Sequence, residues 1–155
     1  VSIGCLSTMA LYDWLLQQPL EQFAYNKSNY KTMGDKEIEI KCLFRQPEIV
    51  RRALCETKKK HLESGQFEER IDQLRNVWPK LRNRLQNHLL PTTKLKYLLE
   101  AANAPIQAHQ IGISEEHLKR TIRAARFIRS RYTILDLLDQ TGLLDKALSE
   151  AQLPM

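Results

Sequence analysis

Arginine is the residue type whose number and spacing give this sequence its strongest chemical signal. Guanidinium groups form bidentate hydrogen bonds with phosphate and carboxylate groups. Four arginines, at positions 120, 123, 126 and 129, are spaced three residues apart on a predicted helix. At this spacing their side chains shift gradually around the helix axis. A phosphorylated ligand, an adjoining domain, nucleic acid or solvent alone could meet such a helix face. The candidate residues are Arg120, Arg123, Arg126, Arg129 and Arg131.

Histidine and cysteine do not form a recognisable metal or nucleophile motif. The four histidines are scattered, without an HExxH motif or a pair four residues apart. The three cysteines are an odd number without CxxC spacing, and we expect free thiols, buried in a reducing compartment. The sequence therefore predicts no metal-ligand, catalytic or cofactor-binding residue within the chain. The residues concerned are His61, His88, His109, His117, Cys5, Cys42 and Cys55.

Phosphate-binding glycine loops and a nucleophile elbow are also missing from the sequence. The five glycines are isolated and supply neither GxGxxG nor GxxxxGK[ST], and no serine lies in a GxSxG motif. Because both glycine motifs are missing, we expect neither a dinucleotide-binding domain nor a P-loop domain within the chain. The absence of a GxSxG motif also argues against an independent hydrolase.

Length and composition indicate a single globular domain over residues 1–155. The chain is 43% apolar and 27% charged, as is typical of globular proteins. Its net charge of +6 suits acidic partners such as nucleic acid, phosphorylated metabolites or an acidic neighbouring domain. The apolar start of the chain lacks a basic leader, and Asp13 interrupts it before it reaches spanning length. We therefore expect neither a signal peptide nor a membrane helix, and a cytoplasmic location.

Hydrophobic periodicity predicts an all-α fold, a bundle of six or seven helices. Residues 3–16 are apolar on every side of a helical projection, which indicates a helix that is buried all round. Residues 35–44 fit either a helix capped by Asp35 or a strand. We favour the helix because a lone strand would have no partner.

The later segments carry clearer helix signals. Pro47 suits the first turn of a helix that reaches residue 61, and we expect its Lys58-Lys59-Lys60 end to be solvated. Pro79 predicts a break or kink in a helical segment over 66–90. Ser114, followed by two glutamates, is the clearest helix start, and that helix is expected to reach residue 130. Two shorter helices follow, at 132–142 and 144–151.

Five short blocks of the sequence resemble one enzyme family. In order they are residues 1–6 (VSIGCL), 78–82 (WPKLR), 103–105 (NAP), 111–114 (IGIS) and 128–138 (IRSRYTILDLL). Their order and approximate spacing are similar to those of the bacterial sn-glycerol-1-phosphate dehydrogenases. These enzymes belong to the metal-dependent polyol and iron-type alcohol dehydrogenases and are related in fold to dehydroquinate synthase. The resemblance covers most of the chain, and block 128–138 is its most specific part.

The resemblance implies an oxidoreductase of two domains, in which this chain is the C-terminal helical domain. A Rossmann-like domain, absent from the chain, would bind NAD(P), and a divalent metal, zinc or nickel, would polarise the substrate carbonyl. The complete enzyme would interconvert dihydroxyacetone phosphate and sn-glycerol 1-phosphate, a phospholipid precursor. In this family one metal-binding histidine opens an HGxxVxxG turn, and residues 1–4 are similar to its second half. That histidine would lie just before Val1, so the isolated chain is expected to be inactive.

The alternative is a stand-alone basic helical module that binds nucleic acid through the face from Arg120 to Arg131. We favour it less because no helix-turn-helix signature is present, and Asp136, Asp139 and Asp145 soon follow the basic run. Under the dehydrogenase interpretation, the partners are the nucleotide-binding domain and a small phosphorylated substrate, with no membrane partner. Apolar surface left bare by the absent domain would favour a homo-oligomer.

Overall fold

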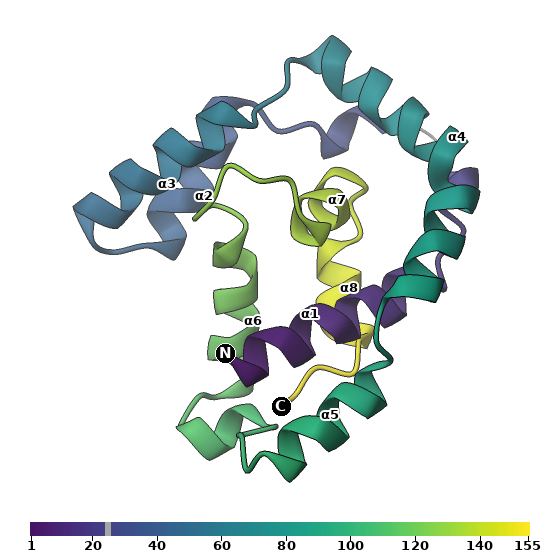
Figure 1. Ribbon diagram of the computed structural model, residues 1–155. Helices are drawn as coiled ribbons and strands as arrows, with labels where there is room; N and C mark the ends of the chain where they lie inside the picture. Colours follow the sequence, from purple (N-terminus) through teal and green to yellow (C-terminus); the bar gives the residue numbers. More distant parts are fainter. Residues whose placement is uncertain (24–25) are drawn as a thin grey trace.

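The computed structural model describes residues 1–23 and 26–155, and within these ranges it contains helices and no strand (Figure 1). The prediction of an all-α multi-helix bundle is confirmed. The α-helices are α1 (Ser2–Leu15), α2 (Met33–Leu43), α3 (Pro47–Lys59), α4 (Ser64–His88), α5 (Thr92–Ala101), α6 (Glu115–Ala125), α7 (Ile134–Gln140) and α8 (Leu144–Glu150). Short 3-10 helices lie at η1 (Leu20–Gln22), η2 (Lys27–Asn29) and η3 (Ala108–Ile111).

Helix α1 lies at the centre of the largest apolar core, which we call the main core. It contacts α5, α7 and α8, and its side chains Leu11 and Leu15 are almost completely buried. The prediction that this helix is buried all round is wrong, because Gly4, Cys5 and Thr8 are exposed along it. The neighbouring helices cover most of its circumference and leave a strip open to solvent.

Helix α4 curves around one side of the molecule and runs through Pro79 without a break (Figure 1). Trp78 is fully buried in the main core, and its Nε1 donates a hydrogen bond to the carbonyl oxygen of Gln18 (3.3 Å). Pro79 is exposed, so its ring lies on the solvent side. The proline is therefore accommodated by curvature of the helix, as is typical of long helices that wrap around a core.

A second, smaller apolar core joins the α2–α3 pair to the end of α6. Its buried members are Ile40, Ala53 and Phe127. Residues 35–44 are helical, as favoured, but the cap of α2 is Thr32 rather than Asp35. The Thr32 Oγ1 accepts a hydrogen bond from the Asp35 amide (3.2 Å), and the Asp35 carboxylate accepts one from the Thr32 amide (2.8 Å). This reciprocal arrangement satisfies two free amides at the start of the helix.

Helix α6 begins as predicted and ends earlier than predicted. The Ser114 Oγ accepts a hydrogen bond from the His117 amide (3.2 Å), which confirms Ser114 as the N-cap. The helix ends at Ala125 rather than near Ser130, and residues 126–133 form a non-helical connection to α7. This connection carries Arg126 into the interior. No helix of the described residues has the length and apolar character needed to cross a membrane.

Candidate functional site

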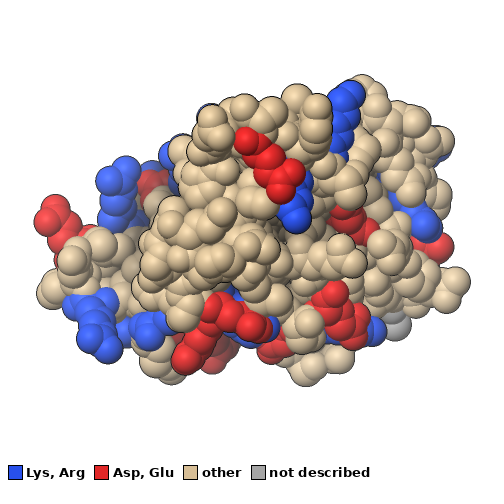
Figure 2. Space-filling model, turned by 90° about the horizontal axis from the view of Figure 1, so that it is seen from below, with Lys and Arg blue, Asp and Glu red and all other residues tan. Residues whose placement is uncertain are grey.

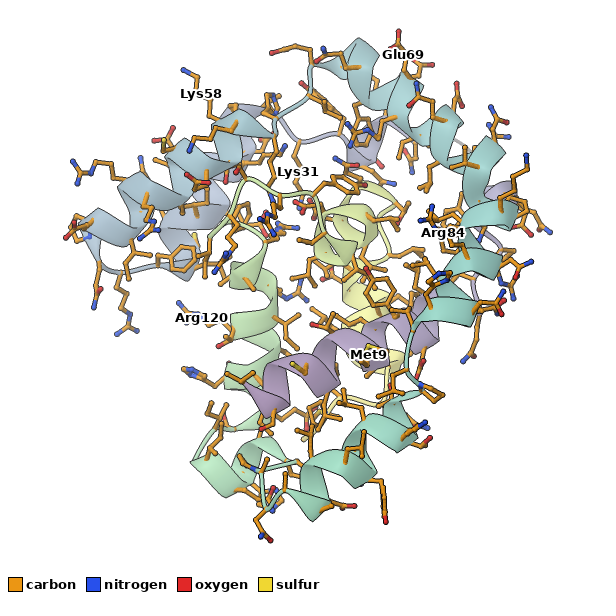
Figure 3. All side chains as sticks on the ribbon, in the orientation of Figure 1. Met9, Lys31, Lys58, Glu69, Arg84 and Arg120 are labelled. Atoms are coloured by element: carbon orange, nitrogen blue, oxygen red, sulfur yellow. The ribbon has the colours of Figure 1, made fainter. Side chains whose placement is uncertain are left out.

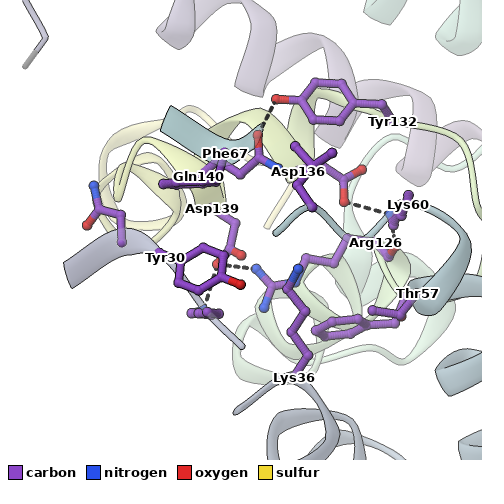
Figure 4. A pocket seen from close by; sticks show the side chains of 14 residues that line it. Tyr30, Lys36, Thr57, Lys60, Phe67, Arg126, Tyr132, Asp136, Asp139 and Gln140 are labelled. Carbon is purple, nitrogen blue, oxygen red and sulfur yellow. Dashed lines mark hydrogen bonds and ion pairs between the residues drawn. The ribbon is translucent and has the colours of Figure 1, made fainter. Parts of the chain in front are cut away.

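A group of buried and half-buried ionic side chains lies where α2, the end of α3, the α6–α7 connection and α7 meet (Figure 4). We call this group the charged cluster. It brings together residues from five separate parts of the sequence, because Lys31 precedes α2 and the others lie on or beside four helices. Its members are Lys31, Lys36, Glu39, Lys60, Arg126, Asp136 and Asp139.

Arg126 is the most deeply buried member of the charged cluster. The residue is only 3% exposed, and its guanidinium forms ion pairs with Glu39 through one terminal nitrogen and with Asp139 through the other. Its guanidinium carbon also lies 4.4 Å from the centre of the Phe127 ring. A buried arginine requires such partners, because an uncompensated charge in the interior is costly.

Lys60 forms a further ion pair of the charged cluster. Its Nζ lies 2.6 Å from Asp136 Oδ1 and also donates a hydrogen bond to the Arg126 carbonyl oxygen. The other carboxylate oxygen of Asp136 accepts hydrogen bonds from the amide (2.9 Å) and hydroxyl (3.0 Å) of Thr133. Asp136 therefore completes the capping box of α7 and, through Lys60, holds the end of α3 against it.

This arrangement corrects the expectation that Lys58-Lys59-Lys60 is a solvated helix end. Lys58 does point outward (Figure 3), and Lys59 pairs with Glu56 on the same helix. Lys60, however, turns inward, with only 11% of its side chain exposed. It is the C-cap of α3, and the chain changes direction there. A run of like charges therefore divides between surface and interior.

Lys31 and Lys36 complete the cluster from the α2 side. Lys31 Nζ bridges Asp139 Oδ1 (2.7 Å) and Glu39 Oε2 (3.3 Å). Lys36 has no carboxylate within ion-pair distance among the described residues, and its Nζ lies 3.0 Å from His61 Nδ1. Burial lowers the pKa of Lys36, although nearby Asp139 opposes the shift. Burial and the Lys36 charge likewise lower the pKa of His61.

A small cavity of about 30 Å³ lies within the charged cluster. Figure 4 shows the Arg126 and Lys36 side chains side by side at this cavity, with Asp139 close to them. Thr57 Oγ1 and Arg126 Nε are buried and have no hydrogen-bond partner among the described residues. Tyr132 lies at the edge, where its hydroxyl donates a hydrogen bond to Gln140 Oε1 (2.9 Å).

The five arginines predicted as a phosphate or domain contact do not share one helix face. Arg120 donates to the carbonyl oxygens of Cys42 (3.0 Å) and Leu43 (3.2 Å), at the end of α2. Arg123 pairs with Asp145, and Arg126 belongs to the charged cluster. Arg129 and Arg131 lie beyond the end of α6, exposed and without an ion-pair partner in the described chain. Only these two remain fully available for an external ligand.

The surface does not add a basic patch on the face that Figure 2 shows. Lysine and arginine side chains are interspersed there with aspartate and glutamate among large uncharged areas. This distribution gives the nucleic-acid alternative no specific support.

A larger groove of about 810 Å³ runs between α1, the end of α4, the start of α5 and the C-terminal residues. Sequence patterns did not predict it. Trp14 Nε1 donates a hydrogen bond to Glu150 Oε2 (3.0 Å) at this groove, and Arg82 and Lys96 also line it. Its size is in the range of small-molecule sites.

Cysteine and histidine form no centre in the described part of the chain. Cys5, Cys42 and Cys55 are free thiols, as expected, but they are exposed rather than buried. No three His, Cys, Asp or Glu side chains of the described residues are grouped so that they could hold a metal ion.

No protein-family model, curated protein or solved structure matches this chain.

Proposed function

We propose that the chain is the helical domain of an NAD(P)- and metal-dependent sn-glycerol-1-phosphate dehydrogenase. In the complete enzyme, dihydroxyacetone phosphate and sn-glycerol 1-phosphate would be interconverted where this domain meets the nucleotide-binding domain. The observation that carries the proposal is that the five sequence blocks resembling this family meet in one folded unit.

The meeting of the blocks rests on specific contacts. Ser2 Oγ of the first block donates a hydrogen bond to the Pro105 carbonyl oxygen of the third block (2.6 Å). Ile3, Trp78 and Leu138, from three different blocks, are buried together in the main core. Ile113 of the fourth block packs against that core. About half of the residues in the five blocks are exposed, and the contacts between blocks are made by the buried and half-buried ones. Contacts of this kind support a shared fold more strongly than a shared chemistry.

The proposal assigns the metal and the nucleotide to residues outside this chain. Lewis-acid polarisation of the substrate carbonyl and hydride transfer would be supplied there when metal and NAD(P) are bound.

Within this chain, Arg129 and Arg131 are the arginines that the proposal makes available to the substrate phosphate or the neighbouring domain. Both are exposed in the α6–α7 connection. The amide of the intervening Ser130 donates a hydrogen bond to Glu56 Oε2 (3.0 Å), which ties this connection to α3. The two guanidinium groups are therefore presented from an anchored segment.

The decisive experiment expresses this chain together with the coding region that precedes Val1. We expect NAD(P)H oxidation that depends on dihydroxyacetone phosphate and on added zinc or nickel, whereas the chain alone is inactive. A longer product that neither binds metal nor oxidises NAD(P)H contradicts the proposal. Salt-sensitive DNA binding by the chain alone would instead favour the nucleic-acid alternative.

Two variants of that longer product test the arginines. If Arg131 contacts the substrate phosphate, Arg131→Met raises KM for dihydroxyacetone phosphate by about tenfold or more, since a charge-assisted bond is lost. The same applies to Arg129→Met. Lys58→Met is the matched control, because it removes an exposed charge on α3.

A further inference from the structure

We propose that the cavity in the charged cluster binds a single monoatomic anion, with chloride as the natural candidate. The proposal goes beyond the dehydrogenase assignment and does not rest on it. Three observations carry it: the balance of charges around the cavity, the unpaired donors in its wall and its size.

The charged cluster contains one more cation than carboxylate. Lys31, Lys60 and Arg126 can each be matched with one of the three carboxylates, Glu39, Asp136 and Asp139. Lys36, half-buried and lining the same cavity, is the fourth cation and has no carboxylate partner in the described chain. Leaving a desolvated ammonium without a counter-charge is costly. One bound anion would balance the cluster.

The wall of the cavity also presents donors that nothing in the described chain accepts. Thr57 and Arg126 both line the cavity, and Thr57 Oγ1 and Arg126 Nε are buried without hydrogen-bond partners in the described chain. Together with the Lys36 ammonium they give a hydroxyl, a guanidinium N–H and a charged amine around one small space. Buried donors of this kind are normally satisfied by a bound water or ion.

The carboxylates in the wall do not oppose such an anion strongly, because each is already neutralised. Asp139 accepts from Lys31 and is paired with Arg126. Asp136 accepts from Lys60 through one oxygen and from Thr133 through the other. The excess positive charge therefore remains on the Lys36 side of the cavity.

The size of the cavity limits its occupant. A buried water needs about 10–15 Å³ of such space, so about 30 Å³ accepts one monoatomic anion or two waters. A phosphate group, with five heavy atoms, is larger than one or two waters and is not the occupant that we propose. The proposal therefore separates this site from the substrate phosphate of the proposed reaction.

Thermal unfolding of the chain in sodium chloride, compared with sodium gluconate at equal ionic strength, tests the proposal. Gluconate is too large for the cavity, so general screening is matched while the specific anion is removed. We expect a saturable rise in Tm of roughly 3–6 °C at a chloride concentration about ten times its Kd. Equal Tm values in both salts at all concentrations would overturn the proposal and leave water as the occupant.

Two lysine variants localise the effect. Lys36→Met removes the ammonium that has no carboxylate partner in the described chain and should abolish the chloride dependence of Tm, while circular dichroism shows that the helices are retained. Lys58→Met removes an exposed lysine and should keep the dependence of the wild type. If Lys36→Met keeps the full chloride dependence, the anion binds elsewhere and the proposal is wrong.

Crystals grown in bromide provide an independent measurement. We expect an anomalous peak within hydrogen-bond distance of Thr57 Oγ1 and Lys36 Nζ. Water alone at that position would overturn the proposal, whatever the Tm values show.

Discussion

The main core and the charged cluster connect different parts of the chain by different physical means. In the main core, Leu11, Trp78 and Leu138 are almost completely buried, and each contributes in proportion to the apolar surface removed from water. In the charged cluster, the cost of desolvating the ions offsets much of their attraction. We therefore expect the main core to supply stability. The charged cluster would then specify how the α2–α3 pair meets the α6–α7 connection.

The largest effect is expected from breaking the main core. Trp78→Ala should lower the free energy of unfolding by about 3–5 kcal/mol, because it leaves a large cavity and removes the hydrogen bond to Gln18. Urea unfolding followed by circular dichroism measures the change. Tyr97→Ala, at a largely exposed aromatic on α5, is the matched control and should change stability by less than about 0.5 kcal/mol. Similar losses in both variants would contradict a core role for Trp78.

Breaking the charged cluster should be costly only when it leaves ions unpaired. Arg126→Met is expected to lower the free energy of unfolding by about 3 kcal/mol, because the two carboxylates of Glu39 and Asp139 then share Lys31 as their one remaining ion-pair partner in the described chain. The double variant Arg126→Met/Asp139→Leu should recover much of this loss, since Lys31 can still pair with Glu39.

Arg123→Met is the control for that pair of variants. The Asp145 partner of Arg123 is largely exposed, so the change is expected to cost about 0–1 kcal/mol. If the double variant is as unstable as Arg126→Met, the loss reflects packing rather than uncompensated charge. In that case the charged cluster would also contribute to stability by packing, as the main core does.

A smaller effect is expected at the start of α6, which packs on the main core through Leu118 and Ile122. Ser114→Ala removes the side-chain acceptor of the His117 amide and should cost about 1 kcal/mol. Thr121→Ala, at an exposed position of the same helix, is the matched control. An equal change in both variants would show that the cap is not what stabilises this helix start.

The smallest effect is expected from His61, which contacts Lys36 of the charged cluster and makes stability depend on pH. Because the folded pKa of His61 lies below its ordinary value of 6.5, the unfolded chain binds a proton at higher pH than the folded chain does. The free energy of unfolding should therefore fall as the pH drops below about 6.5 and through the folded pKa. Comparing His61→Gln with the wild type at about pH 7.5 and pH 5.5 isolates this contribution. A variant that loses as much stability as the wild type on acidification would rule out His61 as the cause.

Local sequence signals predicted the helices better than they predicted ionic partners. Ser114 caps α6 through its own side chain, and Pro47 favours the first turn of α3 through its restricted backbone. Both signals are local, so both helix starts were predicted correctly. Asp35 and the end of α6 were predicted less well, because Thr32 competes for the cap and residues 126–133 leave the helix.

The charged cluster was missed, although a partial signal exists in the sequence. Asp136 and Asp139 are three residues apart on the apolar helix α7, and Lys36 and Glu39 have the same spacing on α2. That spacing places each pair on one side of its helix, which predicts a polar strip. It does not reveal that the two strips face each other.

By itself, the sequence determined that the chain is helical, where most helices begin and that its motifs contain no complete catalytic set. These properties depend on side-chain periodicity and on contacts within a few residues. Only the tertiary structure decided that Arg126 turns inward to meet Glu39, 87 positions away along the chain, while Arg129 and Arg131 stay exposed. The physical reason is that the environment of a charge depends on which distant helices pack around it. Five arginines that look alike in the sequence therefore acquire different roles.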